Sequence, residues 1–165
     1  MKIAIIYTTL NSSTKKSCKI LAGKLNADVQ RIPIEMAKKD CVLKYNFIIL
    51  AGSAVHGRVQ GELKRYISQN LKTLNEKPHA LILNGEDEKD LYNKTFTEKL
   101  VNSSFMNSNF GYELNPDDGN IIDKRLTKRL TEKLTKQNRN LPSLNLQEID
   151  NFSEKINNMI EKRVD

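Results

Sequence analysis

Short apolar runs along the chain alternate with stretches whose apolar residues recur every three or four positions. The apolar runs predict strands at residues 2–7, 28–34, 46–51 and 79–84, with a weaker strand within residues 105–114. The run FIILA at residues 47–51 is apolar at every position, which is typical of a central strand covered on both faces. Strands that alternate with helices in this way predict βαβ units and a parallel sheet.

Stretches with helical periodicity fill the gaps between these strands. They predict helices at residues 14–25, 62–74 and 94–101, and a last helix whose apolar positions are Leu146, Ile149, Phe152, Ile156 and Ile160. Asn145, with Glu148 three residues later, is expected to cap the start of this last helix. The chain of 165 residues is long enough to bury a full core, and it is interpreted as a single domain over residues 1–165.

One predicted helix, at residues 121–134, differs from the others because it is strongly basic. Its apolar stripe consists of Ile122, Leu126, Leu130 and Leu134, and lysine and arginine occupy much of the remaining surface. The favoured interpretation is an added helix that packs its leucine stripe on the sheet. A helix that docks on a membrane surface or a partner is the alternative.

The net charge of +7 raises the question of an anionic partner, but the basic residues are spread along the chain. The five Phe and five Tyr residues do not cluster in any basic run, so there is no platform on which single-stranded nucleic acid would stack. We therefore predict no nucleic-acid partner. A solvated basic surface is expected, with an anionic protein or a peripheral membrane contact as alternatives.

The apolar runs and the cysteines indicate a cytoplasmic protein. No apolar stretch approaches the roughly 20 residues that span a bilayer, and the first residues lack a signal-peptide pattern. Cys18 and Cys41 match no metal or CxxC spacing and are expected to be reduced, buried thiols. With only two histidines, His56 and His79, we predict no metal site.

A polar loop joins the first strand to the first helix and consists of Thr8, Thr9, Leu10, Asn11, Ser12, Ser13 and Thr14. Five of these seven side chains, all except Leu10 and Asn11, carry a hydroxyl. Backbone amides that are free at a helix N-terminus, together with the helix dipole, favour an anion there. The loop predicts a site for a small phosphate-bearing ligand. A capped turn that binds nothing is the alternative.

Two further loops are expected beside this one. If the sheet has the order 2-1-3-4-5, the loops after the first and third strands lie side by side where the chain order reverses. The loop at residues 52–61 contains three glycines that allow close approach to a flat ligand, and its candidate binding residues are Ser53, Ala54, Val55, His56 and Gly57. His56 would stack on a ring or donate a hydrogen bond, or else simply be exposed. Asn84 and Gly85 would close the far side.

Several enzyme classes lack their sequence signatures here. The chain contains no GxSxG elbow, no GxxxxGK[ST] phosphate loop and no GxGxxG motif. Tyr7 and Thr8 stand where a phosphate-receiving signalling domain would carry a cluster of acids. His56 is the only candidate for an acid or base near the expected ligand, and the catalytic residues stay unassigned.

Three blocks carry a resemblance to a known family. They are KIAIIYTTLNSSTKK at residues 2–16, YNFIILAGSAVHGRVQGELKRYI at residues 45–67, and more weakly NKTFTEKL at residues 93–100. The chain resembles the flavodoxin superfamily, and more closely its branch of flavodoxin-domain proteins related to menaquinone-dependent protoporphyrinogen oxidase.

This resemblance implies an α/β, flavodoxin-like three-layer sandwich with a five-stranded parallel sheet of order 2-1-3-4-5 and helices on both faces. It implies non-covalently bound FMN, with the phosphate in the loop from Thr8 to Thr14. The isoalloxazine would lie between the loop from Ser53 to Gly57 and the residues Asn84 and Gly85. Ring redox chemistry would pass electrons to a partner protein, a quinone or another small acceptor.

The chain also departs from the family pattern. Relatives typically carry glycine inside the phosphate loop, in a pattern like T-x-T-G-x-T, where this chain has Ser12 after Asn11. Relatives often place an aromatic residue near the ring, where this chain has His56, and there is no tryptophan. The first hypothesis is an FMN-binding electron-transfer protein or small oxidoreductase. The alternatives are a binding or scaffold module that has lost flavin, and a protoporphyrinogen-oxidase-like enzyme.

Overall fold

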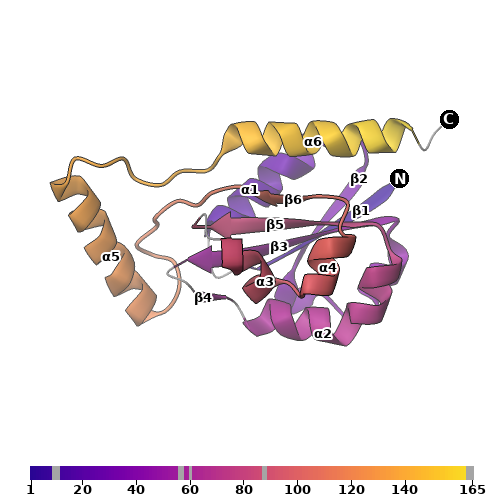
Figure 1. Ribbon diagram of the computed structural model, residues 1–165, viewed down its shortest axis with the longest axis horizontal. Coiled ribbons are helices and arrows are strands. Elements are labelled where there is room, and N and C mark those ends of the chain that lie inside the picture. The colour runs from indigo at the N-terminus through magenta and orange to yellow at the C-terminus, as the bar shows by residue number, and fades with distance from the viewer. Residues whose placement is uncertain (9–11, 56–57, 60, 87–88, 163–165) are drawn as a thin grey trace.

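The computed structural model describes residues 1–8, 12–55, 58–59, 61–86 and 89–162. Within these residues, five parallel strands form a sheet in the order β2-β1-β3-β5-β6 (Figure 1). They are β1 (Lys2–Tyr7), β2 (Asp28–Pro33), β3 (Phe47–Val55), β5 (His79–Gly85) and β6 (Asn107–Asn109). The short β4 (Arg58–Val59) pairs antiparallel with the end of β3. The predicted parallel order 2-1-3-4-5 is confirmed, with β4 as an addition.

Helices cover both faces of this sheet, as Figure 1 shows. One face carries α1 (Ser12–Lys24) and α6 (Leu146–Glu161), and the other carries α2 (Gly61–Glu76), α3 (Lys89–Thr95) and α4 (Glu98–Ser103). Two short 3₁₀ turns, η1 (Ile34–Met36) and η2 (Cys41–Lys44), lie between β2 and β3. The predicted three-layer α/β sandwich is confirmed.

The alternation of side chains along each strand builds two separate cores. Successive side chains of a strand point to opposite faces of the sheet. Ile3 and Ile5 therefore join the core beneath α1 and α6, which includes the fully buried Phe152. Ala4 and Ile6 join the core on the opposite face, beneath α2 and α4. The central strands are apolar on both faces because helices cover both faces.

The third strand is longer than its apolar run predicts. The glycine-containing loop was expected to begin at Gly52, but β3 continues through Val55, and Ala54 pairs with Val59. A Cβ atom on Gly52 would lie 2.8 Å from Cδ2 of Leu63. This glycine therefore allows α2 to pack closely on an extended strand, and it does not mark a turn.

The predicted helix at residues 94–101 is two helices. The α3 helix ends at Thr95 and α4 begins at Glu98. Between them, Thr97 has an extended backbone, and its hydroxyl accepts a hydrogen bond from the Leu100 amide at 3.4 Å. A threonine that caps a new helix interrupts the old one, so the apolar periodicity here spans a break.

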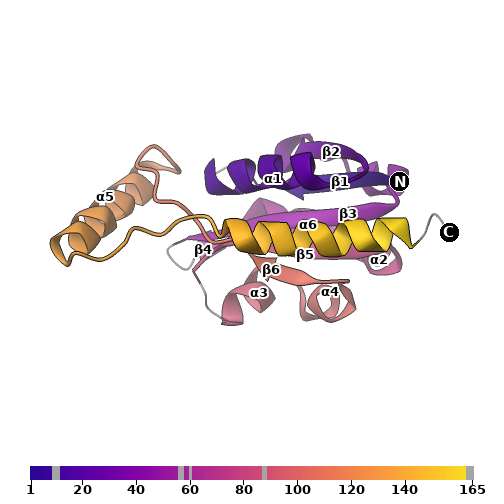
Figure 2. The ribbon, with the colours of Figure 1, turned by 90° about the horizontal axis from the view of Figure 1, so that it is seen from above.

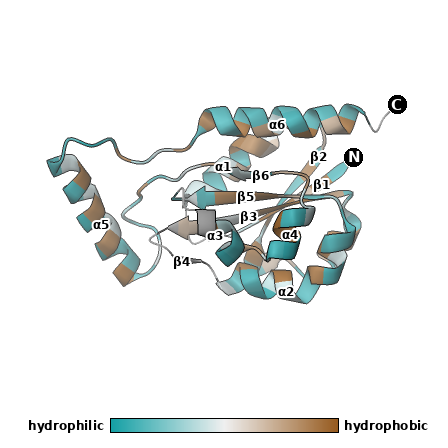
Figure 3. Ribbon diagram, viewed as in Figure 1, coloured by the Kyte–Doolittle hydropathy of each residue, from teal (hydrophilic) through white to brown (hydrophobic). Residues whose placement is uncertain are grey.

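The basic helix forms as α5 (Ile121–Lys136) but does not pack on the sheet. Figures 1 and 2 show it standing away from the layered body, and Figure 3 shows apolar residues spaced along a largely hydrophilic helix. No described residue of α5 belongs to the apolar clusters that cover the sheet. Ile121 and Ile122 are 70% and 56% exposed, whereas Leu126 and Leu130 are half-buried. The expectation that the leucine stripe packs on the sheet is therefore wrong.

The last helix follows its prediction closely. The side chain of Asn145 caps α6 by accepting a hydrogen bond from the Glu148 amide at 3.1 Å. Phe152 packs edge-on against Phe110, with ring centroids 5.3 Å apart. Among the described residues, no helix combines the length and the apolarity needed to cross a bilayer.

Candidate functional site

Three polar residues lie at the carboxyl ends of the central strands. Thr8 follows β1, Ser53 lies near the end of β3 and Asn84 lies near the end of β5, and all three are buried. Strands β1 and β3 are neighbours, with β2 on one side and β5 on the other, so the chain order reverses between them. Open α/β sheets bind their ligands at such a point. This edge is therefore the candidate site.

The N-terminus of α1 faces a negative charge supplied by the chain itself. The backbone N–H and the hydroxyl of Ser12 both donate to Oδ2 of Asp118, each at 2.8 Å. Asn115 Nδ2 donates to the other oxygen of the same carboxylate at 3.2 Å. Free amides and the helix dipole make a helix N-terminus favourable for an anion. In this structure the anion at the first turn of α1 is the carboxylate of Asp118.

Two buried hydroxyl groups of the predicted phosphate loop lack hydrogen-bond partners. Thr8 and Thr14 are both 0% exposed, and neither Oγ1 atom has a partner in the structure. Buried polar atoms are almost always hydrogen-bonded, so each exception needs an explanation. Thr14 belongs to the first turn of α1, and Thr8 ends the strand that leads to it. An acceptor oxygen of a bound ligand would satisfy both groups.

Residues 111–119, here named the covering segment, lie against the first turns of α1. The amide of Glu113 donates to Oγ of Ser13 at 2.8 Å. The carboxylate of Glu113 pairs with Lys16, whose Nζ lies 2.7 Å from Oε1. A positive charge close to the predicted phosphate loop is thus engaged by an acidic residue of the covering segment.

Asn84 and Gly85 have structural tasks at this edge. Oδ1 of Asn84 accepts a hydrogen bond from Ser17 Oγ at 2.9 Å, and its Nδ2 donates to the Gly111 carbonyl at 2.9 Å. The Asn84 side chain therefore ties β5 to α1 and to the covering segment. A Cβ atom on Gly85 would lie 2.1 Å from the carbonyl oxygen of Ala54, so no larger residue fits without a shift of the backbone. Their predicted contact with a flavin ring stays a prediction.

The structure brings together those predicted site residues that it describes in full: Thr8, Ser12, Ser13, Thr14, Ser53, Ala54, Asn84 and Gly85. Val55 is described only as a backbone position of β3. The remaining candidates lie outside the described residues: Thr9, Leu10, Asn11, His56 and Gly57.

Sequence reasoning missed the residues that the covering segment brings to the site. Asp118 and Glu113 lie about one hundred positions from the α1 residues that they contact, at separations of 106 and 97 to 100. They form no motif with the phosphate loop, and Asp118 is one of two adjacent aspartates in a loop, a pattern that is common on protein surfaces. Ser17 lies within the predicted helix at residues 14–25, and no sequence pattern there indicates that its hydroxyl contacts Asn84.

An aromatic residue also reaches this edge from the covering segment. Burial is the main cause that raises the pKa of the Tyr112 hydroxyl, and the negative charge of Glu86, which follows β5, adds to it.

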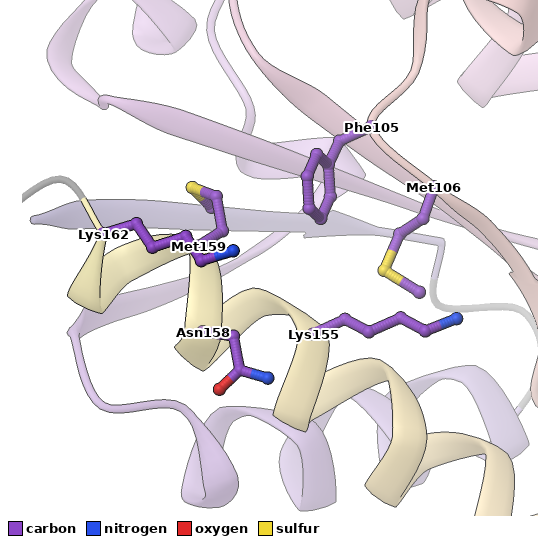
Figure 4. Close-up of a pocket in the computed structure, with 6 residues that line it drawn as sticks. All are labelled: Phe105, Met106, Lys155, Asn158, Met159 and Lys162. Carbon is purple, nitrogen blue, oxygen red and sulfur yellow. The ribbon is translucent and has the colours of Figure 1, made fainter.

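A cavity at the opposite end of the molecule is distinct from this site. It has a volume of about 420 Å³ and is lined by Phe105, Met106, Lys155, Asn158, Met159 and Lys162 (Figure 4). The amide of Phe105 donates to the carbonyl of His79, the first residue of β5, at 2.7 Å. The cavity therefore lies at the amino ends of the strands and does not adjoin the reversal point.

Structural comparison places known flavodoxins on this fold. Oxidised flavodoxin 2 from Bacillus cereus is 20% identical and superimposes with a TM-score of 0.55, over 81% of this chain and 99% of that one. Flavodoxin from Streptococcus pneumoniae TIGR4 is 14% identical with a TM-score of 0.54, over 83% and 99% of the two chains. Two-electron-reduced flavodoxin from Megasphaera elsdenii is 14% identical with a TM-score of 0.54, over 65% and 84%. At these identities the likeness shows the fold alone.

Sequence comparison supplies the family. A search of curated proteins produced no match. The family described as "Flavodoxin domain", however, matches residues 4–141, which include most of β1, all of α1, the carboxyl ends of β3 and β5, and the covering segment. Because this match extends over most of the chain and agrees with the strand order, the protein belongs to the flavodoxin domain family.

Proposed function

We propose that the protein binds FMN non-covalently at the carboxyl ends of β1, β3 and β5 and transfers electrons, as a carrier or a small oxidoreductase. The observation that carries the proposal is the pair of buried, unpartnered hydroxyls of Thr8 and Thr14 beside an anion-binding helix terminus. Hydroxyl and amide donors without a basic side chain suit a phosphate monoester at a helix N-terminus.

The residues at this edge have the chemical groups needed to bind both the phosphate and the isoalloxazine of FMN. The first turn of α1 would hold the FMN phosphate through the Ser12 amide and the nearby hydroxyls. The end of β3, including Ser53, would flank the isoalloxazine with its backbone, and Gly85 would allow close approach from the other side. These roles follow the family resemblance.

The chemistry supplied by bound FMN is the reversible uptake of one or two electrons, which the polypeptide tunes through backbone contacts and local charge. Ser53 and Asn84 are buried next to each other on paired strands, so this part of the edge excludes water. No described side chain at the edge is assigned as an acid or a base. Electron transfer without a protein-bound catalyst is therefore the reaction that we propose.

Flavin titration tests the proposal. FMN fluorescence should be quenched on binding to the purified protein, and Thr14→Val should weaken binding by about tenfold, because it removes one hydrogen bond to a charged group. Valine replaces a hydroxyl that has no partner in the free protein, so the fold should be unaffected. Thr95→Val is the matched control, since Thr95 is 1% exposed with an unpartnered Oγ1 but lies in α3.

Two results would contradict this proposal. The first is protein that is colourless when purified and leaves FMN fluorescence unchanged at high micromolar concentrations. The second is equal weakening of FMN binding by Thr14→Val and Thr95→Val, which would show that neither hydroxyl marks the phosphate position.

A flavodoxin-fold binding module that has lost flavin is the second candidate. The position of Asp118 favours it, because a carboxylate already satisfies the α1 donors. Ser12 in place of the usual loop glycine favours it as well. This candidate predicts no flavin binding by the wild-type protein or by any variant at Ser12.

The electron partners are a narrower proposal. A redox protein, a quinone or another small acceptor would take the electrons, and the basic helix α5 would make a peripheral contact with a membrane that holds a quinone. We propose a cytoplasmic location. Protoporphyrinogen oxidation with menaquinone as electron acceptor is the specific activity suggested by the resemblance. Porphyrin fluorescence, measured with the FMN-loaded protein and with a quinone-free control, tests it.

A further inference from the structure

The first turn of α1 has a bound anion that belongs to the same polypeptide. Oδ2 of Asp118 accepts two hydrogen bonds from Ser12, one from the backbone N–H and one from the hydroxyl, both at 2.8 Å. Asn115 donates to Oδ1 of Asp118 and also to Oγ of Ser12, at 3.2 and 3.1 Å. This arrangement is a built carboxylate site rather than a chance approach of an exposed side chain.

A ligand phosphate and Asp118 need the same donors. The backbone N–H and the hydroxyl of Ser12 each carry one hydrogen, and both hydrogens are directed at the Asp118 carboxylate. A phosphate placed at the same turn would also carry negative charge beside that carboxylate, and like charges at contact distance repel. A phosphate that takes the two Ser12 donors therefore requires Asp118 to leave.

The covering segment is held in a way that permits this departure. Its described contacts with α1 are hydrogen bonds and the ion pair between Lys16 and Glu113, whose side chains are 55% and 37% exposed. Exposed ion pairs contribute little to stability. The segment continues through Gly119, at φ +76°, into α5, which takes no part in the described apolar clusters. Releasing Asp118 breaks no apolar core packing that is described.

We propose that Asp118 is an internal competitor for the phosphate of the flavin nucleotide. Asp118 occupies the phosphate position when no ligand is bound. Binding of the nucleotide displaces Asp118 together with the start of α5. This proposal rests on the function proposed above. It makes Asp118 the residue that sets how strongly the site prefers FMN over riboflavin, which lacks the phosphate.

Asp118→Asn tests the competition, with Asp117→Asn as the matched control. Both variants remove one negative charge from adjacent positions, but the structure gives Asp117 a hydrogen bond only through its backbone N–H. An asparagine at position 118 still accepts from the Ser12 amide, and asparagine serves about as well as aspartate at a helix N-terminus, so the fold should persist. Asp118→Asn should bind FMN about tenfold more tightly than wild type, since it replaces a charged competitor by a neutral one.

Riboflavin separates competition for phosphate from a general change in the site. Its affinity should change by less than about twofold in both variants, because it brings no anion to the first turn of α1. Asp117→Asn should leave both ligands unchanged within the same margin. Equal FMN affinity in wild type and Asp118→Asn would overturn the proposal, and so would an equal gain for FMN and riboflavin.

Inorganic phosphate distinguishes failure of this proposal from failure of the proposed function. Phosphate is added to about 10 mM at constant ionic strength, a concentration on the order of the Kd expected for a weak site. It should raise the Tm of Asp118→Asn but not the Tm of wild type or of Asp117→Asn. If that pattern appears while no protein binds flavin, Asp118 guards a phosphate position and the FMN assignment is wrong. If flavin binds equally to all three proteins and phosphate raises no Tm, the FMN assignment stands and the competition does not.

Hydrogen exchange supplies a measurement that needs no variant. In wild type, ligand binding should speed amide exchange in the covering segment, whose Glu113 amide is bonded to Ser13 Oγ in the free protein. Exchange in α6 should stay the same. FMN is the probe if it binds, and otherwise phosphate at high concentration. Slower exchange in the covering segment on binding would overturn the proposal, because the segment would then close over the ligand.

Discussion

The layered body and the arm, which consists of the covering segment and α5, both contain helices with an apolar stripe. The two stripes differ in how far they are buried. In α6, Ile149, Phe152 and Ile156 are fully buried against the sheet, whereas Leu146 at the start of the helix is 56% exposed. In α5, the stripe runs from Ile122, which is 56% exposed, to Leu134, which is 9% exposed. Figure 2 shows α6 lying along the strands and α5 standing beyond them.

The difference teaches that helical periodicity identifies an apolar face but not the surface that covers it. The described hydrogen bonds and the ion pair hold the covering segment to the body: Asp118 and Glu113 contact the first turns of α1, and Gly111 accepts from Asn84. The body is stabilised by apolar burial, whereas this junction is stabilised by hydrogen bonds and charge. The two regions should therefore respond differently to substitution, salt and ligands.

The largest effect is expected where α6 meets the sheet. Phe152→Ala should lower the free energy of unfolding by about 3–5 kcal/mol, because it removes a fully buried ring that packs on Phe110. Leu126→Ala in α5 should cost less than about 1 kcal/mol, because that side chain is only half-buried. Urea unfolding measures both. Equal losses would show that α5 is as firmly packed as α6.

A smaller effect is expected at the closest backbone approach in the sheet. Gly85→Ala should destabilise the protein by about 3 kcal/mol, because its Cβ would lie 2.1 Å from the Ala54 carbonyl oxygen and force β3 and β5 apart. Gly23→Ala is the control, since nothing lies within 4 Å of its Cβ in α1, and it should stabilise by up to about 1 kcal/mol. Thermal unfolding of the two variants decides whether the space around each glycine is as described.

The junction of body and arm is tested by Asn84→Ala. This change removes the Asn84 amide that donates to the Gly111 carbonyl and leaves the buried Ser17 hydroxyl only the Thr14 carbonyl, 3.1 Å away, so it should cost about 1–3 kcal/mol. It should also speed hydrogen exchange in the covering segment more than in α6. Uniformly faster exchange in both regions would show that Asn84 supports the whole sheet and does not join body to arm.

The smallest effect concerns the two thiols. Burial raises the pKa of the Cys18 thiol to about 12, so at pH 8 about one molecule in ten thousand carries the thiolate. A disulfide reagent at pH 8 should therefore label one thiol, Cys41, in the native protein and both after denaturation. Cys41→Ser should abolish native labelling. Rapid labelling of Cys18 would mean that α1 opens from the body.

The same thiol gives a pH dependence with a definite sign. The unfolded chain loses the Cys18 proton above pH 9.0, whereas the folded protein keeps it to about pH 12. Stability from this group is therefore complete below pH 9.0 and declines as the pH rises beyond it. In Cys18→Ala, the free energy of unfolding should decline less steeply between pH 9.0 and about pH 12. Urea unfolding at several pH values measures this decline. An identical decline would contradict the buried, protonated thiol.

Much of the fold was predictable because strands and helices leave local patterns. The apolar run at residues 47–51 predicted a central strand, and Asn145 with Glu148 predicted the start of α6. The extension of β3 through Val55 was not predictable, because Gly52 and Gly57 indicate a loop when tertiary packing is unknown. Thr97 began a new helix within a continuous apolar pattern, where capping outweighed periodicity.

The candidate site was predictable only in the parts that its own loops supply. Polar residues after β1 and β5 indicated a ligand site at the carboxyl ends of the strands, and Thr8 and Asn84 lie there. The contact of Asp118 with Ser12 spans 106 residues and depends on how the covering segment crosses α1. No local pattern encodes such a path.

The start of α5 has a consequence for any encounter with an anionic surface. Oδ1 of Asn120 accepts from the amides of Ile122 and Asp123, and Oδ2 of Asp123 accepts from the Asn120 amide, so the helix closes its own first turn. It needs no neighbour to complete this end. Displacement of Asp118, as proposed, would therefore move α5 as an already formed basic helix, and an anionic surface would contact it without first having to order a disordered chain.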